Sequence, residues 1–387
     1  MIIELHMLQN FAPSCLNRDD TNSPKECEFG GYRRARISSQ CIKRSIRQYF
    51  KSSSLLPPEN LASRTLRLVD DLAQRLVRQG KPEGQARQVV KKVIQGINLG
   101  LDDKDKTQYL IFIGEEEIAR MAELIIGQWD ALAGSVREGE SDKKKKKDES
   151  LKSFSEILTG GKAADLALFG RMLADLPDKN INAACQVAHA ISTHKVSVEF
   201  DFYTAMDDLK KPEEEAGAGM MGTVEFNSAC FYRYANIDIN QLADNLLGKL
   251  REKATTDELK EANSLAGKTV EAFIRAAVNA VPTGKQNSFA AQNPPSFVFA
   301  VARNSGAWSL ANAFASPVRV GESGDLVQKS TDALLDYWGK LVRVYSDEDI
   351  KLSTAFALDS LEMKGLDDAS NLEGLIDRVN QAIAVDC

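Results

Sequence analysis

A basic segment between Gly30 and Lys51 holds the residues with the clearest chemistry in this sequence. It contains seven basic side chains and no acidic one: Arg33, Arg34, Arg36, Lys43, Arg44, Arg47 and Lys51. Cations spaced three and four apart on a helix repel one another, so a row without acids favours an anionic partner. Long basic side chains in a row suit a phosphate chain better than one small ligand. A solvated basic face that pairs with acids elsewhere on the protein remains the alternative.

Helical geometry would place most of these cations together. Ser38 or Ser39 offers an N-cap for a helix that runs to about Phe50. At about 100° per residue, one arc of this helix holds Gln40, Lys43, Arg44, Arg47 and Lys51, and another holds Ile42, Ile46, Tyr49 and Phe50. The helix start adds amide donors where the helix dipole favours negative charge. The preceding loop, over about residues 11–37, adds Asn17, Arg18 and Lys25, and Gly30-Gly31, where backbone can approach a ligand closely.

The composition of the whole chain has to be weighed against this segment. The 387 residues are 43% hydrophobic and 27% charged, and the net charge of −6 taken alone argues mildly against a nucleic-acid partner. The segment contributes +7, however, so the other residues sum to −13. No run approaches about 18 apolar residues and no secretory signal is recognisable, so we expect no membrane span. The six cysteines lack metal-site spacing and indicate reduced thiols in a cytoplasmic protein.

Few residues offer catalysis or metal binding. His189 and His194 are five apart, whereas metal-binding histidines on one helix face need a spacing of three or four. A buried or capping histidine at a helix end is favoured, with an RNA contact by His194 as the alternative. Asp19-Asp20 and Asp207-Asp208 lie in predicted loops, where turn capping is favoured over magnesium binding. We predict no catalytic residue, no metal and no cofactor.

The elements that must position these residues indicate an α+β fold. Alternation predicts a strand at residues 1–10, and β-type segments predict strands at 196–206, 223–239 and 296–303. Helical patterns predict helices at 38–50, 241–252, 256–280, 326–344 and 370–384. Residues 60–191 predict four to six further helices. With that block set aside as an insertion, the order strand–helix–strand–strand–helix–strand is that of the ferredoxin-like fold, which the RNA-recognition module shares. The lysine run at 143–147 receives no role, and a glycine- and acid-rich loop spans 207–222.

Several blocks resemble the CasC (Cse4) family, the backbone subunits of type I-E CRISPR Cascade complexes. They are NRDD (17–20), FGG (29–31), RISSQ (36–40) with Lys43-Arg44, FGRM (169–172), QVAHAISTH (186–194), GTVEF (222–226) and VPTGKQNS (281–288). The resemblance is weakest around 60–150 and at the C-terminus. It implies a hand-like fold: a palm with a modified RNA-recognition fold at 1–54 and 192–387, helical fingers at 55–191, and a thumb loop at about 207–221 between two palm strands.

The resemblance also implies a function. Several copies of a non-catalytic subunit would polymerise along the spacer of a CRISPR RNA (crRNA), grip its backbone whatever its sequence, and present the guide bases for pairing with target DNA. The implied partners are the crRNA, the target DNA strand, neighbouring copies, the subunits CasA, CasB, CasD and CasE, and a recruited helicase–nuclease. The predicted RNA-binding residues are Asn17, Arg18, Lys25, Arg34, Arg36, Ser38, Gln40, Lys43, Arg44, Arg47 and Lys285.

Three methionines are candidate wedges, meaning side chains that press against an unstacked base or contact a neighbouring subunit. They are Met172, Met220 and Met221, and ordinary core packing is the alternative for each. Two other functions stay open. One is a metal-dependent nuclease subunit that would use Asp19 or Asp20, and the other is a stand-alone single-stranded RNA-binding protein.

Overall fold

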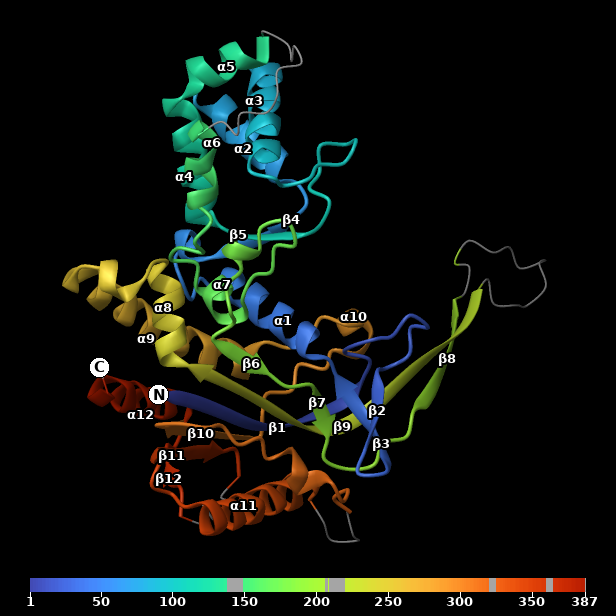
Figure 1. Cartoon of the computed structure of the whole chain (residues 1–387). Coiled ribbons are helices and arrows are strands. Elements are labelled where there is room, and N and C mark those ends of the chain that lie inside the picture. Colours follow the sequence, from blue (N-terminus) through green and yellow to red (C-terminus); the bar gives the residue numbers. More distant parts are fainter. Residues whose placement is uncertain (138–148, 206–207, 209–219, 320–324, 360–364, 387) are drawn as a thin grey trace, which may run out of the picture. The chain divides into compact units, whose positions relative to one another are not determined.

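The chain forms two units in the computed structural model, which describes all residues except 138–148, 206–207, 209–219, 320–324, 360–364 and 387 (Figure 1). The first unit consists of Met1–Tyr49, Gln186–Asn236 and Phe273–Cys387, and the second of Phe50–Cys185 and Ile237–Ala272. Four elements have residues in both units: α1 (Ser39–Ser52), β6 (Cys185–Val187), β9 (Met220–Asp238) and α9 (Thr256–Asn279). No described helix is both long and apolar enough to cross a bilayer.

A large mixed sheet forms the first unit. Its strands follow the order β12-β11-β10-β1-β9-β7-β3-β2, and β6 and β8 also pair with β9. The remaining strands are β1 (Ile2–Ser14), β2 (Glu26–Phe29), β3 (Tyr32–Ile37), β7 (Ala190–Ser192), β8 (Glu199–Ala205), β10 (Phe297–Arg303), β11 (Ile350–Ala357) and β12 (Asp367–Asp368). The helices are α10 (Gln286–Phe289), α11 (Leu326–Tyr345) and α12 (Leu372–Asp386), with a short 3-10 helix at Ala311–Phe314.

Strand β10 is buried on both faces, as expected of a strand inside a large sheet. Successive side chains of a strand point to opposite faces. One face of β10 contributes Phe297, Phe299 and Val301 to an apolar cluster that includes Leu334 and Trp338 of α11. The residues between them, Val298, Ala300 and Ala302, are also fully buried. Helix α12 contacts β10 and β11. The middle of the sheet is therefore covered on both faces.

The six predicted elements are present in the predicted order, as β1, α1, β8, β9, α9 and β10, and their strands are neighbours in the order β10-β1-β9-β8. Four strands that were not predicted interrupt this series: β2, β3, β6 and β7. Strands β8 and β9 form the expected antiparallel hairpin, in register from Glu199↔Phe226 to Ala205↔Met220. Most of the loop between them, and the lysine run at 143–147, lie outside the described residues. The α+β class is thus confirmed.

The prediction of a long loop over residues 11–37 is wrong. Strand β1 continues to Ser14, and β2 and β3 pair as a hairpin that turns at Gly30-Gly31. Both glycines have positive φ, 62° and 78°, as a two-residue type I′ turn requires. A Cβ on Gly30 would lie 1.9 Å from the carbonyl oxygen of Ala315. This glycine therefore lets the turn approach the chain's own backbone rather than a ligand.

The second unit is mainly helical. It contains α2 (Leu68–Arg78), α3 (Glu83–Gly96), α4 (Glu115–Gly127), α5 (Trp129–Arg137), α6 (Glu149–Glu156), α7 (Ala164–Phe169) and α8 (Ile239–Leu247), with 3-10 helices at Pro58–Asn60, Pro177–Lys179 and Arg251–Lys253. The described helices α2–α7 match the predicted four to six. An antiparallel pair of strands, β4 (Ala62–Thr65) and β5 (Ile111–Gly114), was not predicted. The core holds apolar residues at helical spacing, including Leu72, Val93 and Met121.

Candidate nucleic-acid interface

The start of α1 is held by side chains from three separate segments. The Ser38 hydroxyl accepts a hydrogen bond from the Cys41 amide at 3.4 Å, which makes Ser38 the cap. The Asn17 side-chain oxygen accepts from the Ser38 amide at 2.8 Å. The Nδ1 atom of His189 accepts from the Ser39 amide at 3.2 Å. Amides that a helix start leaves without intrahelical partners are thus used to anchor two other segments.

The loop from Asn17 to Lys25 is closed by its own hydrogen bonds. The Lys25 amide donates to the Asn17 carbonyl at 2.8 Å. One carboxylate oxygen of Asp19 accepts from the Thr21 amide at 2.9 Å, the Thr21 hydroxyl at 2.8 Å and the Ser23 amide at 3.0 Å. The Thr21 hydroxyl bond, with these amides, lowers the pKa of Asp19. Asp19 thus caps a turn, as the sequence favoured. No group of three or more His, Cys, Asp or Glu in the described part of the chain is arranged to hold a metal.

Helix α1 separates its cations from its core side. Ile42, Ile46 and Phe50 are buried. Gln40 and Arg44 are exposed and Lys43 and Arg47 are half-buried, and Arg44 donates to the Gln48 side chain at 3.1 Å. The predicted division of the helix into an apolar arc and a basic arc is therefore present.

A distant segment, residues 283–285, meets this helix and the Asn17–Lys25 loop. A Cβ on Gly284 would lie 2.3 Å from the carbonyl oxygen of Leu16, so only glycine permits this approach. Arg18, Arg44, Thr283 and Gly284 line one cavity of about 310 Å³. Burial raises the pKa of Cys15, and the positive charges of Lys285 and Arg18 oppose that shift. The structure thus brings Arg18, Arg44 and Lys285 to one place.

The arginines of β3 have different environments. Arg34 is fully buried and its guanidinium donates to the carbonyl oxygens of Ser192 at 3.1 Å and Phe314 at 2.6 Å. This corrects the prediction that Arg34 contacts RNA, because the guanidinium links segments inside the unit. Arg33 forms an ion pair with Glu26 at 2.9 Å. The half-buried Arg36 lies 3.3 Å from Nδ1 of His189 and remains at the site.

His189 is the residue of this site that the sequence did not assign to it. The favoured capping role is present, since His189 precedes β7 and accepts from the Ser39 amide at the first residue of α1, a helix distant in sequence. Burial, together with the positive charges of Arg36 and Lys25, lowers the pKa of His189. Only the pairing of β3 with β7, Arg36↔Ile191 and Ile37↔Ala190, brings His189 to α1. No local sequence pattern predicts that pairing.

The three candidate wedges are all exposed, which excludes ordinary core packing. Met172 follows α7 in the second unit and is 80% exposed. Met220 and Met221 begin β9, opposite β8, and are 59% and 66% exposed.

Comparisons with known proteins agree with these observations. The sequence profile described as CT1975-like protein matches residues 3–378. A chain of a solved "CRISPR RNA-guided surveillance complex, pre-nicking" is 28% identical with a TM-score of 0.84, and the match covers 99% of this chain and 100% of that chain. A chain of a "CRISPR RNA-guided surveillance complex" is 24% identical with a TM-score of 0.74 and the same coverage, and shows the fold alone. No curated protein matches the sequence significantly.

Proposed function

The chain belongs to the CT1975-like family, the non-catalytic backbone subunits of type I-E CRISPR surveillance (Cascade) complexes, and from this premise we propose how it holds the crRNA. The proposed contacts are a basic cluster, defined as Arg18, Lys25, Arg36, Lys43, Arg44, Arg47 and Lys285. Asn17, Ser38 and Gln40 supply polar groups beside it. The cluster binds phosphates and sugars of the crRNA.

The observation that carries this proposal is the convergence of three segments at one helix start. Arg18 comes from the loop after β1, Arg44 from α1 and Lys285 from the segment before α10, and the Arg18 and Arg44 side chains line the same cavity. The helix start adds a positive end of the helix dipole. Flexible cations around such a site fit a chain of phosphates, each of which needs charge but no fixed base.

Binding through the backbone suits a subunit that must accept every spacer. Phosphate and sugar contacts fix the position of a nucleic acid without reading its sequence, and RNA-guided complexes leave sequence reading to base pairing. We propose that several copies line the spacer and present its bases to the target DNA strand. The other partners in this proposal are CasA, CasB, CasD, CasE and a helicase–nuclease, all in the cytoplasm.

We also propose that the chain has a hand-like division. The palm is 1–54 and 192–387, with the modified RNA-recognition fold, the fingers are 55–191 and the thumb is about 207–221. Met172 from the fingers, and Met220 and Met221 from the end of the thumb, act as wedges that displace a guide nucleotide or touch a neighbouring copy. Their exposure supports this role, since an exposed methionine offers a flexible apolar surface for a base or a partner.

The test compares a double variant with its matched control. Arg44→Ala with Lys285→Ala removes two cations of the basic cluster, whereas Lys340→Ala removes an exposed cation of α11. Binding of two crRNAs with unrelated spacers is measured over a salt series. We expect the double variant to bind both RNAs more weakly, by the same factor. The slope of log K against log salt should become about 1.4 less steep, since each single-strand phosphate contact contributes about 0.7. Lys340→Ala should leave the slope unchanged.

Two outcomes would count against the proposal. A loss confined to one spacer would mean that bases, not phosphates, are contacted. Cleavage of complementary RNA by the assembled complex with magnesium, abolished by Asp19→Ala or Asp20→Ala, would favour the nuclease function instead.

A further inference from the structure

Met172 is an exposed residue between two buried neighbours. Arg171 is 4% exposed and Leu173 is 1% exposed, whereas Met172 between them is 80% exposed. Leu173 belongs to the core of the second unit. Since both neighbours are anchored inward, the side chain of Met172 is directed outward by the backbone on either side of it. A loop with this pattern fixes the place of one apolar side chain.

Met172 lies in a loop of residues 171–181, called the Met172 loop here, whose base is closed by backbone hydrogen bonds. The Arg171 amide donates to the Ile181 carbonyl at 3.0 Å, and the Ile181 amide returns a bond to the Arg171 carbonyl at 2.9 Å. The Leu173 amide donates to the Asn180 side-chain oxygen at 2.6 Å. Gly170 enters the loop with φ of 75°, and a Cβ there would lie 2.7 Å from the Ile181 carbonyl oxygen. Hydrogen bonds therefore join the two arms of this loop on both sides of Met172.

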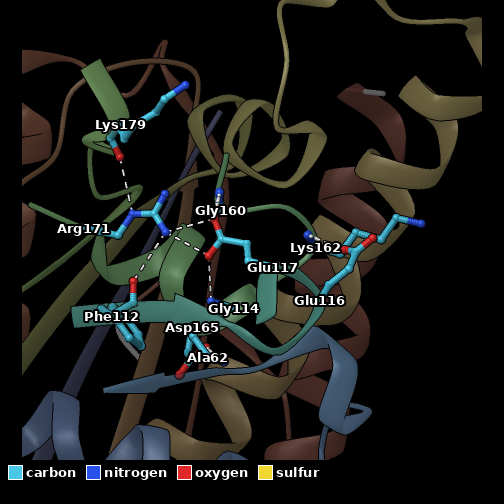
Figure 2. A network of polar contacts seen from close by, with 10 residues as sticks. All are labelled: Ala62, Phe112, Gly114, Glu116, Glu117, Gly160, Lys162, Asp165, Arg171 and Lys179. Atoms are coloured by element: carbon cyan, nitrogen blue, oxygen red, sulfur yellow. Dashed lines mark hydrogen bonds and ion pairs between the residues drawn. The ribbon is translucent and has the colours of Figure 1, made fainter. Parts of the chain in front are cut away.

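A buried ion pair fastens this loop to the rest of the second unit (Figure 2). Nη1 of Arg171 lies 2.9 Å and 2.8 Å from the two carboxylate oxygens of Glu117, and both side chains are nearly inaccessible. The same carboxylate accepts from the Gly114 amide at 2.8 Å and the Gly160 amide at 2.7 Å. Glu117 thus joins the start of α4, the segment before α7 and the Met172 loop.

The guanidinium also spans the loop itself. Its Nε donates to the Lys179 carbonyl at 3.4 Å and its Nη1 to the Phe112 carbonyl of β5 at 3.5 Å (Figure 2). Arg171 therefore contacts the returning arm of the loop, a strand and a helix with one side chain. An apolar residue of the same size could fill the volume but could not make these directed contacts.

The energetics indicate that this pair serves geometry more than stability. Replacing a buried ion pair by packed apolar residues is often neutral or stabilising, because two charges must be desolvated. Nη2 of Arg171 is buried and has no hydrogen-bond partner among the described residues, which adds to that cost. We propose that Arg171 and Glu117 are positioning residues that hold Met172 as a rigid wedge. This inference rests on the proposed wedge function of Met172.

The experiment uses assembled complexes with 2-aminopurine, whose fluorescence rises on unstacking, at successive guide positions of the crRNA. Met172→Ala should lower the signal at the displaced positions. Arg171→Gln should lower it by the same factor, and the double variant should lower it no further, because both changes remove one function. Arg171→Lys keeps one charged donor and should restore part of the signal. The matched control is Arg120→Gln, which removes an exposed ion pair with Glu116 on the same helix α4 and should leave the signal unchanged.

Each result decides between the two levels of the proposal. An unchanged signal in Met172→Ala would refute the wedge function itself. A loss in Met172→Ala but not in assembled Arg171→Gln, or additive losses in the double variant, would refute the positioning role alone. If Arg171→Gln fails to assemble, Arg171→Lys decides, since it keeps a positive charge beside Glu117 but loses the guanidinium bonds to the Lys179 and Phe112 carbonyls. We expect a partial loss from Arg171→Lys, and a full signal would overturn the inference.

Discussion

His189 links the protonation state of one imidazole to the start of the basic helix. Its Nδ1 must be unprotonated to accept from the Ser39 amide, and the groups facing it, Arg36 and Lys25, are both cationic. Its pKa is lowered in the folded state, so the unfolded chain takes up the proton first as the pH falls. The stabilisation is fully present above about pH 6.5, the ordinary pKa of histidine, and decreases as the pH falls below it.

This predicts a pH-dependent difference between the wild type and His189→Gln. The glutamine keeps a neutral acceptor but does not titrate. We compare the urea midpoints of the two free proteins. The advantage of the wild type over His189→Gln should be smallest at about pH 5 and largest above pH 7. The other histidines, His6 and His194, are present in both proteins and cancel in the comparison. A difference that stays constant over this pH range would show that His189 does not titrate at the helix start.

At the residue scale, the sequence shows which side chains are charged but not which of them are exposed. Arg33, Arg34 and Arg36 are alike in the sequence, but one pairs with Glu26, one is buried and one lies at the site. The distinction comes from carbonyl oxygens of residues 192 and 314, which only the tertiary fold places beside β3. The exposed arc of α1 was predictable, because helical geometry alone sets it.

At the element scale, the hairpin of β8 and β9 leaves unusual side chains exposed. Phe200, Phe202, Tyr203, Met220 and Met221 are all exposed large hydrophobic residues of these paired strands. Exposed apolar groups that gather on one element mark an interaction surface. If the hairpin touches a neighbouring copy, Phe202→Ser should reduce the number of copies assembled on a crRNA, as counted by native mass spectrometry.

The control for this prediction is Leu250→Ser. Leu250 and Phe202 are each 64% exposed, so each substitution removes little buried surface. Both should change the free energy of unfolding of the free chain by no more than about 0.5 kcal/mol. Assembly should fall only for Phe202→Ser. Equal assembly of the two variants would mean that the hairpin makes no contact between copies.

Elements with a clear local pattern could be predicted from the sequence, and elements that depend on distant pairing could not. Long amphipathic helices carry a strong periodic pattern, and β1, β9 and β10 are rich in apolar and aromatic residues, so these elements were predictable. Strand β3, with the sequence YRRARI, has no such pattern and becomes a strand because it pairs with β2 and β7. Strand β11 mixes polar and apolar residues and is fixed by its pairing with β10. Pairing partners distant in sequence are what local patterns cannot supply.

At the scale of the whole molecule, net charge is a poor guide to the partner. The total of −6 combines +7 over residues 30–51 with −13 elsewhere. A single copy with so few cations should bind RNA modestly. Linked sites on one strand raise the affinity without new contacts, because each further binding event occurs at a high effective concentration. Weak single sites and a long RNA are therefore compatible.

The length of the RNA should determine how tightly the chain binds it. The full chain should bind an RNA that holds one copy weakly, and RNAs that hold several copies cooperatively, as is usual for proteins that coat single strands. Mass photometry at limiting protein should then show a mixture of bare and fully coated RNAs, with few of intermediate occupancy, for unrelated sequences alike. A stand-alone single-stranded RNA-binding protein would instead fill its sites independently and give a binomial distribution of occupancies. Phe202→Ser should shift the distribution toward that independent pattern, because it should weaken the predicted contacts between copies and leaves the proposed basic cluster unchanged.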